Sequence, residues 1–406
     1  RGVCIQLAPQ SARGVSAVQT GIFKIQAQER VLFGGPAAEA VVTEAEHYGA
    51  RRVFVTSTRS LAALDEGPLQ DIECALGDRY AGTFSAISSH SPREDVIAAA
   101  DAARAADADM LVAVGGGSVV DATKVVQLCL WHDVLTPDAL TPFAAGFERN
   151  KPAMFDVPYD PVRMIAVPTT LSAADFTSRA GITNTEARTK MAFNHRMLVP
   201  RSVVLDPVVT LRTPEWLLYS TGIRALDHEV ESYMCPLANP ATESLSLRGL
   251  ALLAEGLSGI KADATDLNAR MTAQFGMWHA IWPSTSGVYH GASHGIGYAL
   301  GAGFGVPHGH TSCVMLPAVM QWNAETLSER YHALATAIGS PAVSAWQSVR
   351  ALIRDLGMPC TLRDVGIKRK DLETLASRAL DYQPVVLNPR KIETPADVME
   401  ILEIAY

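Results

Sequence analysis

The chain has 406 residues, of which 48% are hydrophobic and 19% are charged, and its formal net charge at pH 7 is −8. This length exceeds what one hydrophobic core comfortably supports, so we expect two domains. The negative charge argues against a general nucleic-acid-binding protein, and no apolar run reaches the ~20 residues of a membrane-spanning helix.

The start of the chain and its cysteines indicate a compartment. The first 22 residues lack the basic and then apolar order of a signal peptide. The six cysteines are scattered and form no Cys-x-x-Cys pair. We therefore expect a cytoplasmic protein with reduced thiols and no zinc ribbon, with neither nucleic acid nor a membrane as a partner.

The first half of the chain alternates between short apolar strands and helices. We expect helices ending near Tyr48 and at 93–106, and strands at Arg30–Phe33, Arg52–Thr56, Ala81–Ser85, Met110–Val114 and Met164–Val167. Strands separated by helices predict a parallel sheet with its ligand at the carboxyl ends of the strands. After Pro207 the pattern becomes helical. The sequence thus predicts an extension over 1–22, an α/β domain over 23–206 and an all-helical domain over 207–406.

The most informative stretch is residues 111–124, which read LVAVGGGSVVDATK. An apolar strand runs into three glycines and then into a helix, for which Ser118 is the expected N-cap. Glycines let a phosphate approach the backbone N–H groups of such a turn closely. The candidate ligand contacts are Gly115, Gly116, Gly117, Ser118, Asp121 and Lys124. A tight turn without a ligand is the other interpretation, and the G-x-G-x-x-G fingerprint is absent.

A second turn, Pro168-Thr169-Thr170, follows the next expected strand. Because both turns lie at carboxyl ends of parallel strands, they are expected to flank one crevice. Thr169 and Thr170 are therefore further candidates for ligand contacts.

The helical half carries the titratable groups. Arg224 and His228 are four residues apart and share one face of a helix. Asp227 points about 100° away from His228 and is not expected to join them.

Four of the eleven histidines fall within residues 290–310, together with seven glycines. His294 and Tyr298 are again four residues apart. His308 and His310 follow a proline, and His310 is equally compatible with a surface position.

These motifs resemble the iron-containing (group III) alcohol dehydrogenases and their dehydroquinate-synthase-like relatives, over about residues 23–406. The glycine run matches the family's G-G-G-S-x-x-D-x-x-K, and residues 293–309 align with its H-x-x-x-H and P-H-G motifs without a gap. The resemblance implies a Rossmann-like α/β domain, an all-α catalytic domain and a homodimer. It also implies NAD(H) or NADP(H), with the pyrophosphate on the glycine turn and Thr169 and Thr170 near the phosphates and nicotinamide.

The family holds a divalent metal with one Asp and three His, and the resemblance places His228, His294 and His308 on the histidine positions. Arg224 stands where the Asp belongs. A guanidinium cannot be a ligand, and its charge repels a cation. Tyr298 replaces the family's second histidine, a proposed proton relay.

The run from Pro168 to Thr177 resembles the maleylacetate reductases, a branch that works without metal. We therefore expect metal-independent hydride transfer to an oxo or enone group of a small acidic substrate. Arg224 would grip a carboxylate, and Tyr298 or His294 would give the proton. His228 and His308 would add hydrogen bonds to the developing negative charge.

Cofactor preference and reaction class stay open. The second strand ends at Ser57, Thr58 and Arg59, with no acidic residue to hold a ribose 2′-hydroxyl. These three residues could hold a 2′-phosphate, although Arg59 could also be a solvated loop residue. The alternatives are a metal-dependent alcohol dehydrogenase using His228, His294 and His308, a synthase-type lyase, for which a lysine cluster is lacking, and a non-catalytic protein.

Overall fold

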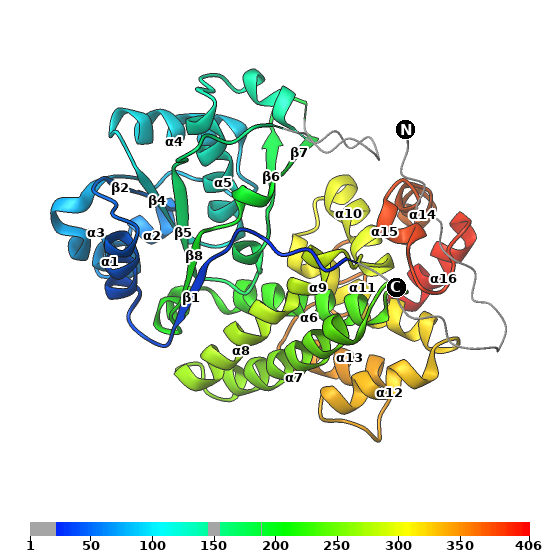
Figure 1. Cartoon of the computed structure of the whole chain (residues 1–406). Helices are drawn as coiled ribbons and strands as arrows, with labels where there is room; N and C mark the ends of the chain where they lie inside the picture. Colours follow the sequence, from blue (N-terminus) through cyan, green and yellow to red (C-terminus); the bar gives the residue numbers. More distant parts are fainter. Residues whose placement is uncertain (1–21, 145–154, 188) are drawn as a thin grey trace.

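The computed structural model describes residues 22–144, 155–187 and 189–406. An α/β lobe and a helical lobe lie side by side (Figure 1). The extension expected over 1–22 lies outside the described residues, apart from Ile22. Within the described part of the chain, no helix is long and apolar enough to cross a membrane. The five cysteines described there form no disulfide.

The α/β lobe is built on a six-stranded sheet with the order β1-β8-β5-β4-β2-β3, and all of its pairings are parallel. The strands are β1 (Arg30–Phe33), β2 (Val53–Thr56), β3 (Tyr80–Phe84), β4 (Met110–Gly115), β5 (Arg163–Pro168) and β8 (Ser202–Leu205). The predicted parallel sheet is confirmed, with β8 as an additional strand between β1 and β5. An antiparallel hairpin of β6 (Arg179–Asn184) and β7 (Thr189–Asn194) was also not expected.

Helices cover both faces of the sheet because its central strands are apolar on both sides. In β4, Leu111 and Ala113 belong to the core formed with α4 (Arg93–Ala105) and α5 (Gly117–Trp131). The alternate residues of β4 pack toward α1 (Ala37–His47) and α3 (Pro68–Leu76). Short α2 (Arg59–Ala62) follows β2. This layering leaves the carboxyl edge of the sheet for the two turns that follow β4 and β5.

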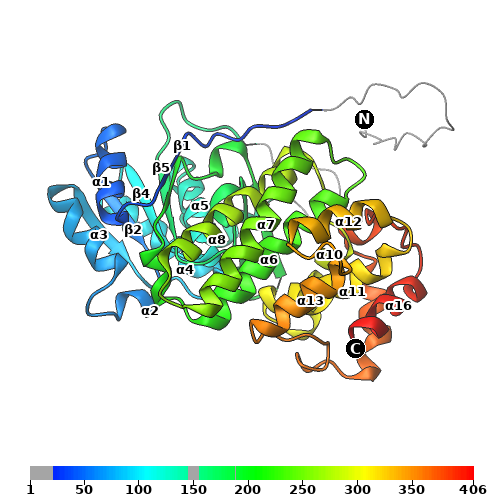
Figure 2. The same cartoon turned by 90° about the horizontal axis from the view of Figure 1, so that it is seen from below.

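The helical lobe surrounds α6 (Glu215–Met234), which is buried on nearly every side from Leu218 onward. Figure 2 shows α6, α7 and α8 running side by side. The other helices are α7 (Pro240–Ala262), α8 (Leu267–Ala280), α9 (Trp282–Ser286), α10 (Ala292–Phe304), α11 (His308–Ala324), α12 (Ser328–Ala337), α13 (Ala345–Asp355), α14 (Leu372–Ala379), α15 (Gln383–Val386) and α16 (Pro395–Ala405). Because α6 is enclosed, polar groups on more than one of its faces meet other helices.

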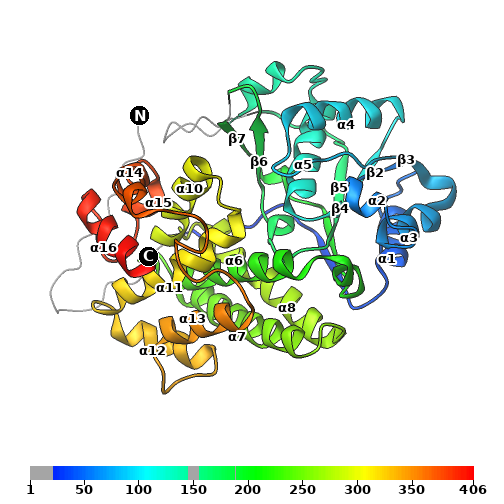
Figure 3. The same ribbon diagram turned by 180° about the vertical axis from the view of Figure 1, so that it is seen from behind.

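The two lobes meet where the turn after β5 contacts α6 (Figure 3). The Thr213 hydroxyl donates to the carbonyl of Thr169 at 2.6 Å. The backbone N–H of Leu171 donates to Thr221 Oγ1 at 3.1 Å. One hydrophobic core runs through both lobes. The turn after β5 is therefore fixed directly to α6, the helix that carries Arg224 and His228.

Helix α7 packs so closely on α8 that Gly256 has no room for a side chain. A Cβ there would lie 2.5 Å from the backbone nitrogen of Ala273. We expect Gly256→Ala to lower the free energy of unfolding by about 1–3 kcal/mol, because backbone atoms cannot yield. Gly301→Ala is the control, since its Cβ meets nothing closer than 3.7 Å. Urea titration checks this, and equal stabilities of the two variants would contradict it.

Candidate active site

The glycine turn after β4 is packed against the turn after β5. Gly115 has a φ of +156°, which favours glycine. A Cβ on Gly116 would lie 2.8 Å from Thr170 Cγ2, and one on Gly117 would lie 3.0 Å from Ser172 Oγ. The N–H of Thr169 donates to the Gly115 carbonyl at 3.1 Å. The two turns therefore lie side by side, and the crevice expected between them stays a prediction.

The first turn of α5 is not capped by a side chain. The helix begins at Gly117 with Gly116 as its N-cap, so the expected Ser118 cap is wrong. Ser118 lies one position inside the helix, and its hydroxyl accepts from the His90 N–H at 3.1 Å. The Ser118 hydroxyl therefore contacts the His90 loop and does not cap α5.

This arrangement fits a bound pyrophosphate. An uncapped helix start directs backbone N–H groups toward an anion. Within the described residues, Thr170 Oγ1 and Ser172 Oγ are buried and have no hydrogen-bond partner. Both hydroxyls adjoin the glycine turn. Ser172 was missed by the sequence analysis, because only its packing against Gly117 singles it out.

Lys124 and Asp121 hold the hairpin against α5. The Lys124 ammonium is fully buried and donates to the carbonyls of Ala174 and Arg179, each at 2.7 Å. Asp121 lies 3.3 Å from that ammonium and accepts from the Gly181 N–H at 2.9 Å. The expected contact of Lys124 with a nucleotide is not supported by this position, because its amine is already surrounded by protein oxygens.

The residues after β2 differ in their availability to a ribose 2′-phosphate. The Ser57 hydroxyl is fully buried and donates to the Val114 carbonyl at 2.9 Å, so the expected contact does not fit Ser57. Thr58 accepts from the Leu61 N–H as the N-cap of α2, and Arg59 is exposed. Only Thr58 and Arg59 stay as candidates for recognising the 2′ position.

Arg224 lies at the centre of the candidate active site in the helical lobe. Its Nη1 donates to Ser312 Oγ at 2.9 Å, and its Nη2 lies 3.2 Å from His308 Nε2. The guanidinium carbon lies 5.7 Å from the centroid of the Tyr298 ring. Tyr298 in turn stacks on His308 with ring centroids 5.9 Å apart. The structure thus brings Arg224, Tyr298 and His308 together, as the sequence analysis expected.

Three imidazole rings form a second group beside Arg224. The ring centroid of His228 lies 4.8 Å from that of His294 and 4.8 Å from that of His290. The ring centroids of His290 and His294 are 4.0 Å apart. His290 was not among the site residues predicted from the sequence, although it precedes His294 by four residues. The ring of His310 contacts Trp216 edge-on, with ring centroids 6.1 Å apart, and takes no part in these imidazole contacts.

Two buried carboxylates of α6 lie behind these rings. Glu231 accepts from the N–H groups of Gly291 and Ser293, at 2.8 and 2.7 Å, at the start of α10. Its Oε2 is also 2.7 Å from Nδ1 of His294. A carboxylate at a helix N-terminus is stabilised by the helix dipole. Glu231 therefore fixes both the start of α10 and the orientation of the His294 ring.

The expectation that Asp227 stands apart from this site is wrong. Its Oδ2 accepts from Ser312 at 2.6 Å and from Ser293 at 2.8 Å. The same oxygen lies 3.5 Å from His294 Nδ1 and 4.0 Å from Arg224 Nη1. Asp227 does point away from His228 around α6, but α10 and α11 wrap that face of the helix as well.

Burial and neighbouring charge set the protonation of the site. Burial raises the pKa of Asp227 to about 6, and burial with the Asp227 charge raises the pKa of Glu231 well above its usual value. Burial, followed by nearby cationic groups, lowers the pKa of His228 and of His294 well below the ordinary value. The charge of Arg224 is the main cause of the lowered pKa of His308. The imidazoles are therefore neutral near pH 7.

The four-ligand metal site implied by the family resemblance does not fit these residues. The guanidinium of Arg224 replaces the expected carboxylate and itself contacts His308. A fixed positive charge at that position opposes a divalent cation. His308 is thus a partner of Arg224 in this structure.

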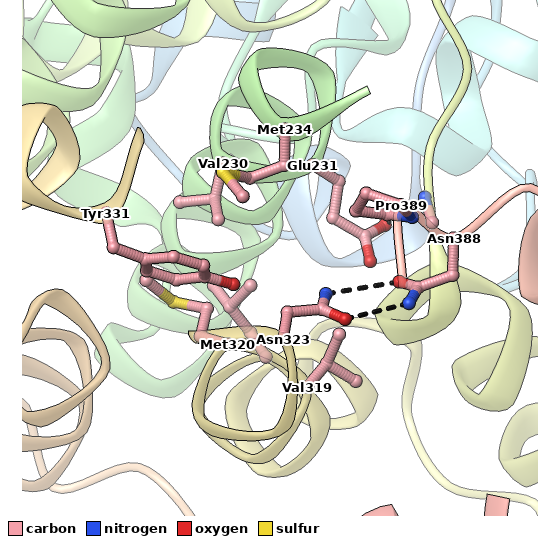
Figure 4. Close-up of a pocket in the computed structure, with 11 residues that line it drawn as sticks. Val230, Glu231, Met234, Val319, Met320, Asn323, Tyr331, Asn388 and Pro389 are labelled. Carbon is pink, nitrogen blue, oxygen red and sulfur yellow. Dashed lines mark hydrogen bonds between the residues drawn. The ribbon is translucent and has the colours of Figure 1, made fainter. Parts of the chain in front are cut away.

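A small cavity of about 10 Å³ lies on the other side of Glu231 (Figure 4). It is lined by Met234, Met320 and the paired amides of Asn323 and Asn388. Such a volume holds about one water molecule. The cavity is therefore too small for a substrate.

Comparisons with known proteins agree on one family. Its sequence profiles "Iron-containing alcohol dehydrogenase" and "Fe-containing alcohol dehydrogenase family, C-terminal" match residues 28–207 and 218–406. Dehydrogenase ALT3 of Alternaria alternata is 33% identical over 88% of this chain and 100% of its own. Maleylacetate reductase of Delftia acidovorans is 28% identical over 93% of this chain and 95% of its own. The crystal structure of maleylacetate reductase from Agrobacterium tumefaciens has a TM-score of 0.80 at 25% identity, covering 96% of this chain and 98% of its own.

Removing an unpartnered hydroxyl beside the glycine turn tests the nucleotide crevice. We expect Thr170→Val to weaken NADH and NADPH binding about tenfold or more, since a hydrogen bond to a charged group contributes about 1.5–3 kcal/mol. Titration of the nicotinamide fluorescence measures this, with Thr336→Val on the exposed face of α12 as the control. Equal affinities of the two variants would remove Thr170 from the crevice.

Asp175, beneath the β5 turn, makes stability depend on pH. Burial raises its pKa to about 7, so the folded state binds a proton more tightly than the unfolded state. The protonated Asp175 carboxyl therefore contributes to the free energy of unfolding below pH ~4, and this contribution is lost as the pH rises through about 7. We expect Asp175→Asn to gain up to about 4 kcal/mol relative to wild type between pH 4 and pH 8. Urea unfolding at both pH values checks this, and the exposed Asp65→Asn should show no such gain.

Proposed function

Because the chain belongs to the iron-containing alcohol dehydrogenase family of NAD(P)-dependent oxidoreductases, we propose that it reduces an oxo or enone group of a small carboxylate-bearing substrate. The electron donor is NADH or NADPH. This is the reaction class of the maleylacetate reductases, to which the chain is similar along most of its length. In this proposal no metal occupies the position of the family's Asp and three His.

The observation that carries the proposal is the position of Arg224. Its guanidinium is buried, contacts Ser312 and His308, and lies beside the aromatic ring of Tyr298. A guanidinium has five donors in a fixed plane, which matches a carboxylate or an oxyanion. The proposed role of Arg224 is to hold the substrate's carboxylate next to the reacting carbon.

The chain's own groups account for the rest of the reaction. A dinucleotide bound at the glycine turn supplies the hydride, and the substrate carbon that receives it becomes saturated. Negative charge then develops on the carbonyl or enolate oxygen, where Arg224 and the neutral imidazoles of His228 and His308 can stabilise it. A proton must finally be added to the substrate.

Tyr298 is the better of the two proton donors considered. Nδ1 of His294 is paired with Glu231, and a neutral ring with its proton on that nitrogen cannot donate from Nε2. Tyr298 is only partly buried and lies between Arg224 and Tyr382. We assign the proton transfer to its hydroxyl.

A metal-dependent alcohol dehydrogenase acting on an alcohol and aldehyde pair is the second candidate. The convergence of His228, His290 and His294 is the observation that favours it. The two candidates differ in substrate class, because a neutral aldehyde gives Arg224 no carboxylate to bind. A panel of oxo acids and neutral aldehydes, each with NADH and NADPH, separates them.

Arg224→Met tests the carboxylate contact while preserving much of the side chain's length. We expect kcat/KM for an oxo acid to fall tenfold to a hundredfold, because a charged hydrogen-bond pair is lost. The loss should be much smaller for the amide of the same acid. Arg248→Met, on the exposed surface of α7, is the control. An equal loss for acid and amide would contradict a carboxylate-binding role.

A further inference from the structure

We infer that the carboxylate-bearing substrate of this enzyme carries a planar conjugated body, such as an aryl-substituted enone, and that Tyr382 recognises this body. The inference deepens the proposed function and rests on it in one respect, because it takes the substrate's carboxylate to lie on Arg224. Tyr382 was not among the site residues predicted from the sequence. It joins the site through its contact with Tyr298.

The first argument is that the side chains beside Arg224 form one connected series of aromatic rings. The centroid of the Tyr298 ring lies 6.3 Å from that of His294 and 5.8 Å from that of Tyr382. Aromatic groups attract one another when their centroids are about 4.5–7 Å apart. A planar ligand therefore finds matching ring faces and edges along this series. Its members are His228, His290, His294, Tyr298, His308 and Tyr382.

The second argument is the charge of this aromatic series. Burial is the main cause of the lowered pKa of His290, as it is for His228 and His294, so these imidazoles are uncharged near pH 7. A tyrosine side chain is ordinarily uncharged at this pH as well. The guanidinium of Arg224 thus lies next to an uncharged aromatic surface. This combination fits a carboxylate that is attached to an uncharged planar group.

The third argument is the direction of the series. Arg224 is buried, whereas Tyr298 and Tyr382 are only partly buried and His308 is exposed. The ring of Tyr298 contacts both Arg224 and Tyr382, which makes Tyr382 the second ring from the guanidinium. A substrate anchored on Arg224 must extend past Tyr298 to reach this second ring. A compact acid such as pyruvate is too short to do so, whereas an aryl-substituted enone acid is long enough.

Close packing holds Tyr382 in this position. The short helix α15 packs on α10 so tightly that a Cβ on Gly295 would lie 2.8 Å from the backbone nitrogen of Val385. Tyr382 is the N-cap residue of α15, and its carbonyl accepts from the Val385 N–H at 3.1 Å. The ring of Tyr382 is therefore placed beside Tyr298 before a ligand arrives, which reduces the entropy lost on binding.

Binding of two matched acids tests the inference without relying on turnover. Benzylidenepyruvate and cyclohexylmethylidenepyruvate are both enone acids, but the first ends in a planar ring and the second in a saturated one. Isothermal titration calorimetry of the protein saturated with NAD⁺ or NADP⁺ gives their dissociation constants. We expect wild type to bind the planar acid about fivefold or more tightly, and Tyr382→Leu to reduce this preference to about twofold or less. Tyr382→Phe should keep the preference, because it keeps the ring.

Two controls accompany the titration. Tyr159→Leu changes a fully exposed tyrosine before the start of β5 and should leave the preference unchanged. Retained NADH binding shows that each variant is folded. If Tyr382→Leu does not fold, Tyr382→His replaces it, since an imidazole offers a smaller ring face and should give an intermediate preference.

The outcomes are distinct. Equal affinities of the two acids for the wild type, or no binding of either, would overturn the inference. A full preference in Tyr382→Leu, or an equal loss in Tyr382→Phe, would overturn the role of the Tyr382 ring. If the preference is found but neither NADH nor NADPH reduces either acid, the inference stands and the proposed reduction fails. Reduction of both acids with equal kcat/KM gives the opposite result.

Discussion

Two buried carboxylates on α6 organise the catalytic lobe. Glu231 holds the start of α10 and the ring of His294, while Asp227 holds Ser293 and Ser312 and lies close to Arg224. Each therefore connects α6 with the segments that carry the histidines. Because isolated charges are costly to bury, these contacts constrain where the histidines and Arg224 can lie. The geometry of the site depends on this carboxylate network.

The network explains how a cationic residue is accommodated at a position that holds a carboxylate in the family. Arg224 is partly balanced by Asp227 and is directed toward Ser312 and His308. This leaves three neutral imidazoles on the other side. The pocket therefore contains a fixed cation suited to an acidic substrate and a separate group of neutral imidazoles.

Local patterns predicted the features that depend on short stretches of sequence. The apolar run before Gly115 predicted a buried strand followed by a turn, because the order of apolar residues and glycines is visible in adjacent positions of the sequence. The four-residue spacing of Arg224 and His228 placed both on one side of α6. Pairwise spacing also identified Tyr298, whose ring lies beside both Arg224 and His308.

Features that depend on packing between distant segments were not predictable in this way. Strand β8 is four residues long and gains its place in the sheet from β1 and β5. Asp227 joins the site only because α10 and α11 enclose that side of α6. His290 lies before α10, where helical spacing does not fix the direction of its side chain. Ser118 lies inside α5, and its hydroxyl contacts the His90 loop.

The most direct test of the account is a crystal structure of the protein with NAD⁺ or NADP⁺ and an oxo acid. The account predicts the pyrophosphate on the glycine turn beside Thr170 and the acid's carboxylate on the guanidinium of Arg224. A carboxylate bound away from Arg224, with that side chain turned out of the pocket, would contradict it.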